Sequence, residues 1–234
     1  MNGMDGMDGI DPTLLLLTDS RLPAGGHAHS GGVEAAIDAG AVRDLDGLAA
    51  FLRGRLATAG LVAAALAAAA CTAAARPAPD WPGLDAEADA RQASPAQREA
   101  ARVQGRLLLR VARRIWPSPV LDGLARAVPE PHHPVALGAV AASVGHAPGQ
   151  AALAAVYAAV TGPATAAVRL LGLDPVQVHG LLARLAPAMR ETAAAAVRRE
   201  TGQDGWADLP ARAAPVLDLL AERHLRSRTR LFVS

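Results

Sequence analysis

Apolar residues recur along this chain at helical spacing, and no stretch alternates between apolar and polar residues as a half-buried strand would. Short breaks rich in proline and glycine separate the apolar segments. Several breaks end in a capping residue followed by proline, as at Asp11-Pro12, Ser94-Pro95, Ser118-Pro119 and Asp174-Pro175, and Asp44 offers a further cap. This pattern predicts an all-α chain.

The same punctuation gives the expected order of elements. Residues 76–84 read as a break, a separate helix is expected on each side of Pro163, and Pro187 is expected to kink a long helix. Because no repeat of about 20–50 residues is present, we expect a single-domain helical bundle of about nine to ten helices. A flexible leader (1–9) would precede an all-helical domain (10–222), and an Arg-rich tail (223–234) would follow it. The helices are expected over 12–17, 32–39, 44–75, 85–92, 94–115, a short segment from 118, 134–144, 148–161, 163–171, a long segment from 174, and 213–222.

Composition supports this interpretation. Hydrophobic residues make up 51% of the 234 residues but aromatic residues only 3%, so the apolar content is largely the helix-forming residues alanine and leucine, with valine. All 23 basic residues are arginine, and the net charge of +1 offers no overall field for nucleic acid or an anionic membrane. The single cysteine, Cys71, and the lack of an evident secretory signal favour a cytoplasmic protein.

Two uncharged runs, 56–75 and 133–168, are long enough to be tested as membrane spans. The first is mostly alanine, which gains little from lipid, and the second is interrupted by glycine and proline. Both runs therefore favour closely packed helices of a soluble protein.

A dense polar loop lies between the first two expected helices, at residues 19–34. Its two Gly-Gly pairs, Gly25-Gly26 and Gly31-Gly32, predict backbone with positive φ or close approach at several points. Joining two helices needs no such segment, since most connections are shorter and need one glycine. We therefore expect this loop to carry function. Its candidate residues are Asp19, Ser20, Pro23, Gly25, Gly26, His29, Ser30, Gly31, Gly32 and Glu34.

Candidate chemistry in the loop leaves alternatives open. Imidazoles suit nickel, copper or zinc, and His27 with His29 supply at most half of a tetrahedral site, with His132-His133 as a second pair. We expect no permanently bound metal. Ser30 beside His29 lacks the context of a nucleophile, and without lysine no P-loop is present. We therefore expect no enzyme activity; the alternative is a helical metal-binding protein or enzyme that uses His27, His29, Ser30 and Glu34.

A stripe of arginines recurs every four residues from Arg98 to Arg114. Like charges at this spacing repel one another mildly. A solvated helix face is the commoner role, and an acidic partner surface is the functional one. A DNA-binding regulator is a third interpretation, which the low net charge and few aromatic residues disfavour. The stripe comprises Arg98, Arg102, Arg106, Arg110 and Arg114.

The C-terminal segment combines four arginines with the apolar run Leu231-Phe232-Val233. A free terminus of this kind usually frays. We expect Arg230, Leu231 and Phe232 to anchor the tail to a partner protein. Deleting 224–234 should then abolish assembly and leave stability nearly unchanged.

Two of these segments resemble signatures of the urease accessory protein F (UreF) family. Residues 19–34 are similar to D-S-x-L-P-x-G-G-x-x-H-S-G-G-x-E, and residues 224–234 are similar to H-x-x-x-x-x-R-L-F-x-S. Weaker similarities lie between them, in family order. The sequence departs from the family at His27, where an aromatic residue is usual, and at Ala101, where serine is common. The weaker matches are Asp85, Arg98, Gly105-Arg106-Leu107-Leu108, 133–138 and 166–170.

The resemblance implies an all-α homodimer that assembles with UreD (also called UreH), the GTPase UreG and apo-urease. It implies a scaffold for nickel insertion that takes part in GTPase regulation, with nickel in transit and no nucleic acid or membrane partner. The tail of UreF proteins becomes ordered on binding UreD. His27 and His29 would contact nickel only transiently. Beside the loop residues, the resemblance points to Arg98, Gly105, Arg106, His224, Arg230, Leu231 and Phe232 as partner-binding or functional residues.

Overall fold

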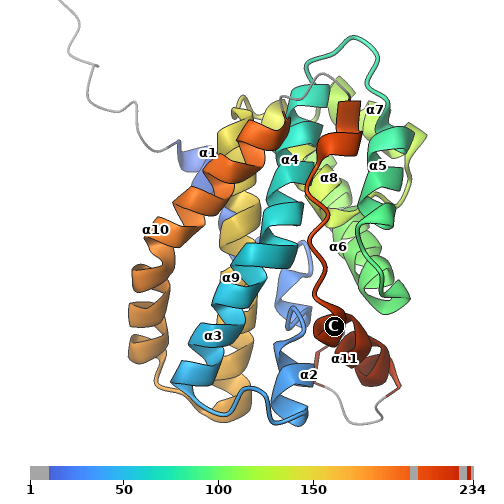
Figure 1. Cartoon of the computed structure of the whole chain (residues 1–234). Helices are drawn as coiled ribbons and strands as arrows, with labels where there is room; N and C mark the ends of the chain where they lie inside the picture. Colours follow the sequence, from blue (N-terminus) through green and yellow to red (C-terminus); the bar gives the residue numbers. More distant parts are fainter. Residues whose placement is uncertain (1–10, 201–204, 227–230, 233–234) are drawn as a thin grey trace, which may run out of the picture.

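The computed structural model describes residues 11–200, 205–226 and 231–232, and in these ranges the chain forms helices and loops with no strand. This confirms the all-α expectation (Figure 1). The expected caps at Asp11, Asp44, Ser94 and Ser118 are also confirmed, because each side chain accepts a backbone N–H of its first helical turn. The elements are α1 (Pro12–Thr18), η1 (Gly26–Ala28), α2 (Val33–Asp38), α3 (Leu45–Arg55), η2 (Leu56–Gly60), α4 (Leu61–Ala73), α5 (Trp81–Ala90), α6 (Pro95–Ile115), α7 (Pro119–Ala127), α8 (His133–Ser143), α9 (Pro148–Leu171), α10 (Pro175–Glu200), η3 (Gly205–Asp208) and α11 (Pro215–Leu225).

Helix α4 forms the centre of the bundle and packs against α8, α9 and α10 (Figure 1). Its residues are mainly alanine, and most of them are buried. Small side chains allow helix backbones to approach closely, and Gly138 on α8 is an example. A Cβ at Gly138 would lie 2.1 Å from the carbonyl oxygen of Ala67. The alanine-rich composition therefore specifies tight helix contacts in the core.

The expected long helix from Asp44 is present, but it contains a turn of π-helix. Segments α3, η2 and α4 form one continuous helix over Leu45–Ala73. Counting it once brings the eleven α-helical segments of the described residues into agreement with the expected nine to ten helices. A Cβ at Gly60 would lie 2.9 Å from the carbonyl oxygen of Arg55, so this close approach within the π-turn favours glycine at its last position.

This helix and α9 are long and apolar enough to cross a membrane by length and composition. In both, more than half of the most apolar window is buried inside the bundle, 67% and 56% respectively. Packing within the protein thus accounts for their apolar character, as expected from the sequence.

Two expected breaks are wrong. The break at 76–84 is shorter, because α5 begins at Trp81 with Asp80 as its N-cap and Pro82 in the first turn, where proline is tolerated. The helices expected on either side of Pro163 are one helix, α9. Pro163 is buried, and burial of the helix around it outweighs one lost backbone hydrogen bond.

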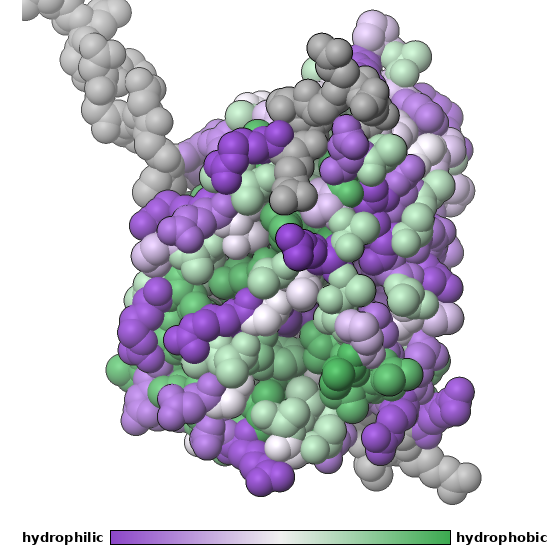
Figure 2. Space-filling view, in the orientation of Figure 1, coloured by the Kyte–Doolittle hydropathy of each residue, from purple (hydrophilic) through white to green (hydrophobic). Residues whose placement is uncertain are grey.

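Helix α11 lies on the edge of the bundle and contacts α2 and α6. Glu222 joins it to the start of α6 by accepting hydrogen bonds from the Ser94 hydroxyl at 2.5 Å and the Ala96 amide at 2.9 Å. The outer surface over α11 is apolar (Figure 2), and Val216 and Leu219, one helical turn apart, are each 68% exposed there.

Candidate functional site

The polar loop between α1 and α2 adopts the backbone that its glycines predict. Gly25, Gly31 and Gly32 have φ of 77°, 61° and 86°, in the left-handed region that favours glycine. A Cβ at Gly25 would lie 2.8 Å from Leu107 Cδ1, and one at Gly31 would lie 2.9 Å from Pro163 Cγ. The loop therefore lies closely against α6 and α9.

Arg55, at the end of α3, fixes the loop to the bundle. Its guanidinium donates to the Gly31 carbonyl at 2.6 Å and to the Ala159 carbonyl at 3.0 Å. Burial lowers the pKa of Arg55 to about 10, so it stays charged at neutral pH. The sequence reasoning missed this residue; the available signal was its place as the last charge before the uncharged run 56–75.

Two sequence motifs meet at Glu34, the last residue of the loop motif. Its carboxylate accepts the backbone N–H of Leu231 at 2.7 Å and that of Phe232 at 3.0 Å. His224, the first residue of the C-terminal motif, places Nε2 3.3 Å from the same carboxylate. Glu34, His224 and Phe232 are all buried. We call these three residues with Leu231 the tail site.

The tail site corrects the expectation for the C-terminus. Phe232 was expected to be free for a partner, but it is buried against the core of its own chain. Leu231 is 79% exposed beside it. The expected helix end at 222 is also too early, since α11 runs to Leu225. Arg230 and Arg228 lie outside the described residues.

The other loop candidates divide into two groups. Asp19, Ser20, Pro23 and Gly26 lie on the outer part of the loop, exposed or half-buried. Hydrogen bonds from Arg21 lower the pKa of Asp19 to about 2. His29 and Ser30 are buried, and the hydroxyl oxygen of Ser30 lies 3.4 Å from the amide nitrogen of Glu34, which donates to it.

Burial also bears on the enzyme alternative. Ser30 has no exposed surface, so a substrate cannot reach its hydroxyl while the loop holds this conformation. Both carboxylate oxygens of Glu34 accept backbone N–H groups of the tail. The loop thus does not present these residues as a nucleophile and its base.

The two histidine pairs come together in part. His29 and His133 interact electrostatically, and burial together with the charge of His29 lowers the pKa of His133 to about 4. Within 11–200, 205–226 and 231–232, no group of three or more His, Cys, Asp or Glu side chains is arranged to hold a metal ion. The side chain of His27 lies outside the described residues.

The low pKa of His133 predicts a pH dependence of stability. Between pH 6.5 and 4 the unfolded chain binds a proton that the folded chain excludes, so the folded state loses stability as the pH falls through this window. Because His133 is partly exposed, we expect a loss of about 2 kcal/mol. Urea unfolding at pH 7 and pH 4.5 should show a smaller loss for His133→Asn than for the parent. His179→Asn, at an exposed histidine, is the control. If both variants lose the same unfolding free energy between pH 7 and pH 4.5, His133 is not the source of the pH dependence.

The α6 candidates lie on a second polar network. Asp85 accepts the amide of His132 at 2.8 Å and lies 3.0 Å from its Nδ1, and Arg102 donates to the other oxygen at 2.9 Å. Burial alone would raise the pKa of Asp85, but the hydrogen bonds and charge of His132 and the charge of Arg102 outweigh it and lower the pKa. Nε2 of His132 lies 3.1 Å from Asp89 without hydrogen-bond alignment.

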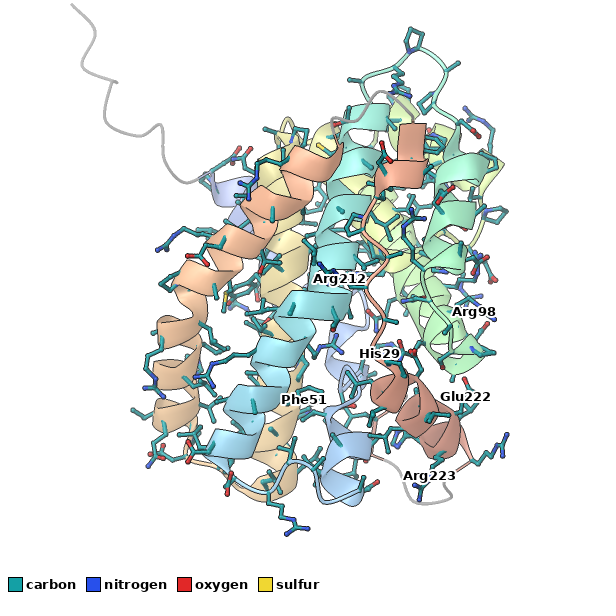
Figure 3. All side chains as sticks on the ribbon, viewed as in Figure 1. His29, Phe51, Arg98, Arg212, Glu222 and Arg223 are labelled. Carbon is teal, nitrogen blue, oxygen red and sulfur yellow. The ribbon has the colours of Figure 1, made fainter. Side chains whose placement is uncertain are left out.

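Gly105 allows this network to form. A Cβ there would lie 1.9 Å from the Pro131 carbonyl oxygen, so only glycine lets α6 lie against the chain that carries His132. Arg106 pairs with Glu130. Arg98 donates to the Gln92 carbonyl at 2.6 Å and lies near Glu222, at the contact of α6 with α11 (Figure 3). Arg98 is therefore the α6 candidate at the α11 contact, and Gly105 is structural.

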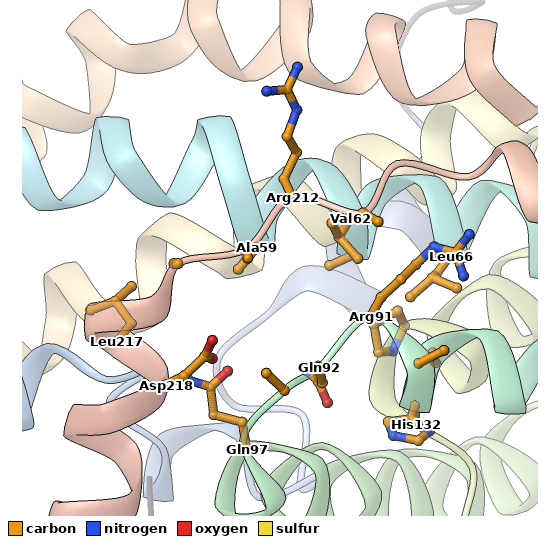
Figure 4. Close-up of a pocket in the computed structure, with 18 of the residues that line it drawn as sticks. Ala59, Val62, Leu66, Arg91, Gln92, Gln97, His132, Arg212, Leu217 and Asp218 are labelled. Carbon is orange, nitrogen blue, oxygen red and sulfur yellow. The ribbon is translucent and has the colours of Figure 1, made fainter.

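A cavity of about 190 Å³ lies under the chain that leads into α11 (Figure 4). Arg91 holds this chain in place by donating to the carbonyl oxygens of Trp206 and Leu209. Gln92 and His132 line one part of the cavity and Asp218 another. Gln92 Oε1 is buried without a hydrogen-bond partner. The cavity suits water or another small hydrogen-bond donor.

Comparison with known proteins identifies the family of this chain. The sequence model of the UreF family matches residues 42–186. The urease accessory protein UreF of Mycobacterium sp. (strain JLS) is 50% identical over 95% of this chain and 98% of its own length. The protein of the same name from Mycolicibacterium vanbaalenii is 49% identical with the same coverage, and that of Mycobacterium tuberculosis H37Rv is 45% identical over 94% and 97%. All three are named accessory proteins and not enzymes. The chain belongs to the UreF family of urease accessory proteins.

Proposed function

We propose that this protein is a non-catalytic scaffold of urease maturation that bridges UreD (UreH) and the GTPase UreG and supports nickel insertion into apo-urease. It acts in the cytoplasm as a homodimer, and nickel passes without a permanent site. His27 and His29 would make transient contacts with the metal. The relatives named above support the role in urease maturation.

The single observation that supports a scaffold best is the tail site. Glu34 joins the loop motif to the tail motif and holds the backbone of Leu231 and Phe232. Phe232 is buried as an anchor, which leaves Leu231 exposed with its backbone already ordered. Ordering a contact residue before binding lowers the entropy lost on association. Val216 and Leu219 of α11 are further exposed apolar side chains.

The tail test compares two exposed apolar residues of similar exposure. Leu231 is 79% exposed at the tail site, and Val176 is 78% exposed on α10. Burying a leucine on a partner contributes about 1.5–3 kcal/mol. Leu231→Asp should therefore weaken assembly with UreD and UreG at least about tenfold, and Val176→Asp should not. Assembly is measured by co-purification and titration, and urease activation follows it.

Three results would contradict the proposed function. The chain could fail to assemble with UreD or UreG, apo-urease could be activated fully without it, or the purified chain could retain a full equivalent of nickel that His29→Ala removes. The third result would favour the metal-binding alternative.

Loop conformation gives an independent test. Gly32 has φ of 86°, and a Cβ there would meet nothing within 4 Å, so Gly32→Val strains the backbone without a steric clash. We expect the variant to remain folded and to activate urease less well. Gly54→Val, at an exposed helical position with equal free space, is the control. If a folded Gly32→Val protein activates urease normally, the loop only connects α1 and α2 and does not carry function.

The homodimer is tested by sedimentation. At micromolar concentration the protein should sediment at about twice its chain mass of 23.8 kDa. A monomer under these conditions, with UreD present and absent, would contradict the dimer.

A further inference from the structure

The arginine stripe of α6 changes its surroundings along the helix. A step of four residues exceeds one helical turn by about 40°, so the stripe winds around α6 and does not stay on one face. Its first members turn toward α5. Arg102 donates to Asp85 at 2.9 Å and to Asp89 at 2.6 Å, and Arg98 donates to the Gln92 carbonyl. These arginines stabilise the fold.

The later members of the stripe reach the outer surface. Together with Arg113 they line a hollow of about 460 Å³ between α6 and α7. We call this hollow the arginine groove. It is lined by Arg106, Arg110, Arg113 and Arg114, by the acidic Asp122, and by apolar Leu109, Pro117, Ala125 and Pro129. It lies on different helices from the tail site, which is built from α2, α11 and the C-terminal residues.

Two of the four guanidiniums have local partners. Arg106 pairs with Glu130, and Arg113 pairs with Asp122 at 2.7 Å. Arg110 and Arg114 are exposed, and among the described residues neither makes an ion pair or a side-chain hydrogen bond. They lie one turn apart, where like charges repel. The groove therefore carries unneutralised positive charge next to apolar surface.

This combination fits one kind of partner. Guanidiniums bind carboxylates through paired hydrogen bonds, and an apolar floor adds affinity for a side chain laid over it. Nucleic acid fits less well, because the groove residues include no aromatic side chain to stack a base. The net charge of +1 also shows that the positive charge is local.

We propose that the arginine groove docks an acidic segment of a partner protein, with two carboxylates about one helical turn apart on Arg110 and Arg114. An apolar side chain of the same segment lies over the floor. The inference rests on the proposed function only for the choice of partners, which are UreD, UreG and apo-urease.

The lack of lysine in this chain allows a site-specific test. Arg110→Lys with Arg114→Lys keeps both charges and creates the only side-chain amines in the chain. A carbodiimide activates a partner carboxylate, and the lysine amine then displaces the activating group to form an amide without a spacer. The exposed pair Arg184→Lys and Arg190→Lys on α10 is the matched control. Mass spectrometry of the cross-linked peptide identifies the partner residue.

We expect cross-links from Lys-substituted 110 or 114 to Asp or Glu of one of the three partners, and none from the control pair. Arg110→Glu with Arg114→Glu should weaken that assembly at least tenfold and reduce its salt dependence, while Arg184→Glu with Arg190→Glu should not. Circular dichroism confirms that each variant is folded. Wild-type affinity of the Arg110→Glu, Arg114→Glu protein for all three partners would overturn the inference. Cross-links only to a second copy of this chain would do the same.

One further arm separates this inference from the proposed function. If the parent protein assembles with none of the three partners, the proposed function fails, and the groove is tested with a synthetic helical peptide that carries two glutamates four residues apart and one leucine. Binding that the Arg110→Glu, Arg114→Glu protein loses supports the groove. No difference between the two proteins overturns it.

Discussion

Replacing Gly105 by alanine is expected to lower the free energy of unfolding by at least about 3 kcal/mol, at the upper end of the range for overpacked cores. The new Cβ would lie 1.9 Å from the Pro131 carbonyl oxygen and 2.8 Å from His132 C and His133 N. These are backbone atoms, so no side-chain rotation relieves the contact. Helix α6 must move away from the start of α8, which also separates Arg102 from Asp85. Urea unfolding followed by circular dichroism measures the loss.

Gly54→Ala is the matched control for this prediction. Gly54 also lies in a helix, is exposed, and would meet nothing within 4 Å. Alanine there should stabilise the protein by about 0.5–1 kcal/mol, since glycine loses more backbone entropy on folding. If both variants change stability in the same direction by similar amounts, close packing at Gly105 is not the reason for its glycine.

Much of the fold could be predicted from the sequence because its signals are local. Capping residues followed by proline mark helix starts within a few residues, and the structure confirms Asp11, Ser94 and Ser118 as caps. Pro163 shows where such signals fail. A proline predicts a break from its own chemistry, but burial of the whole of α9 decides the outcome.

The tail site shows a different limit. The sequence identified the loop motif and the tail motif separately, but nothing in either indicates that Glu34 binds Leu231, which is 197 positions away. Helical periodicity reports which face of a segment is buried and not its partner. The sequence favours an external partner for Phe232 because no neighbouring segment of the chain offers an apolar surface that would bury it. In the structure, the long-range hydrogen bond to Glu34 holds the backbone of Phe232 where its side chain packs on the core.

The arginine stripe lies between these two cases. Its four-residue spacing was evident, and the rotation of about 40° per step follows from helix geometry. Which end of the stripe faces α5 depends on how α6 packs in the bundle, and the sequence does not show that packing. The same residue type therefore stabilises the contact with α5 at Arg102 and lies exposed on the surface at Arg110 and Arg114.

Replacing Glu34 by glutamine is expected to release the tail, at a cost of about 3 kcal/mol in its docking free energy. The carboxylate uses one oxygen for the Leu231 N–H and the other for the Phe232 N–H. An amide has a single acceptor oxygen, so its NH₂ group would face one of these donors. One hydrogen bond is then lost and the other loses its charge assistance, and the loss of a hydrogen bond to a charged group and the unpaired buried donor each cost on the order of 1–3 kcal/mol. Because water hydrates the released tail, the net cost is smaller than their sum.

Hydrogen exchange at Leu231 and Phe232 measures this release most directly. The amides should exchange about a hundredfold faster in Glu34→Gln than in the parent, and in the control Asp38→Asn, an exposed carboxylate on the same helix, they should not. Phe232→Ala should open the tail as well, since burying a phenylalanine contributes about 1.5–3 kcal/mol. Deleting 224–234 is therefore expected to destabilise the bundle, contrary to the expectation from sequence. If Glu34→Gln keeps parental exchange rates, the carboxylate does not hold the tail. If exchange rises but assembly with UreD and UreG is unchanged, an ordered tail is not what presents Leu231 to a partner.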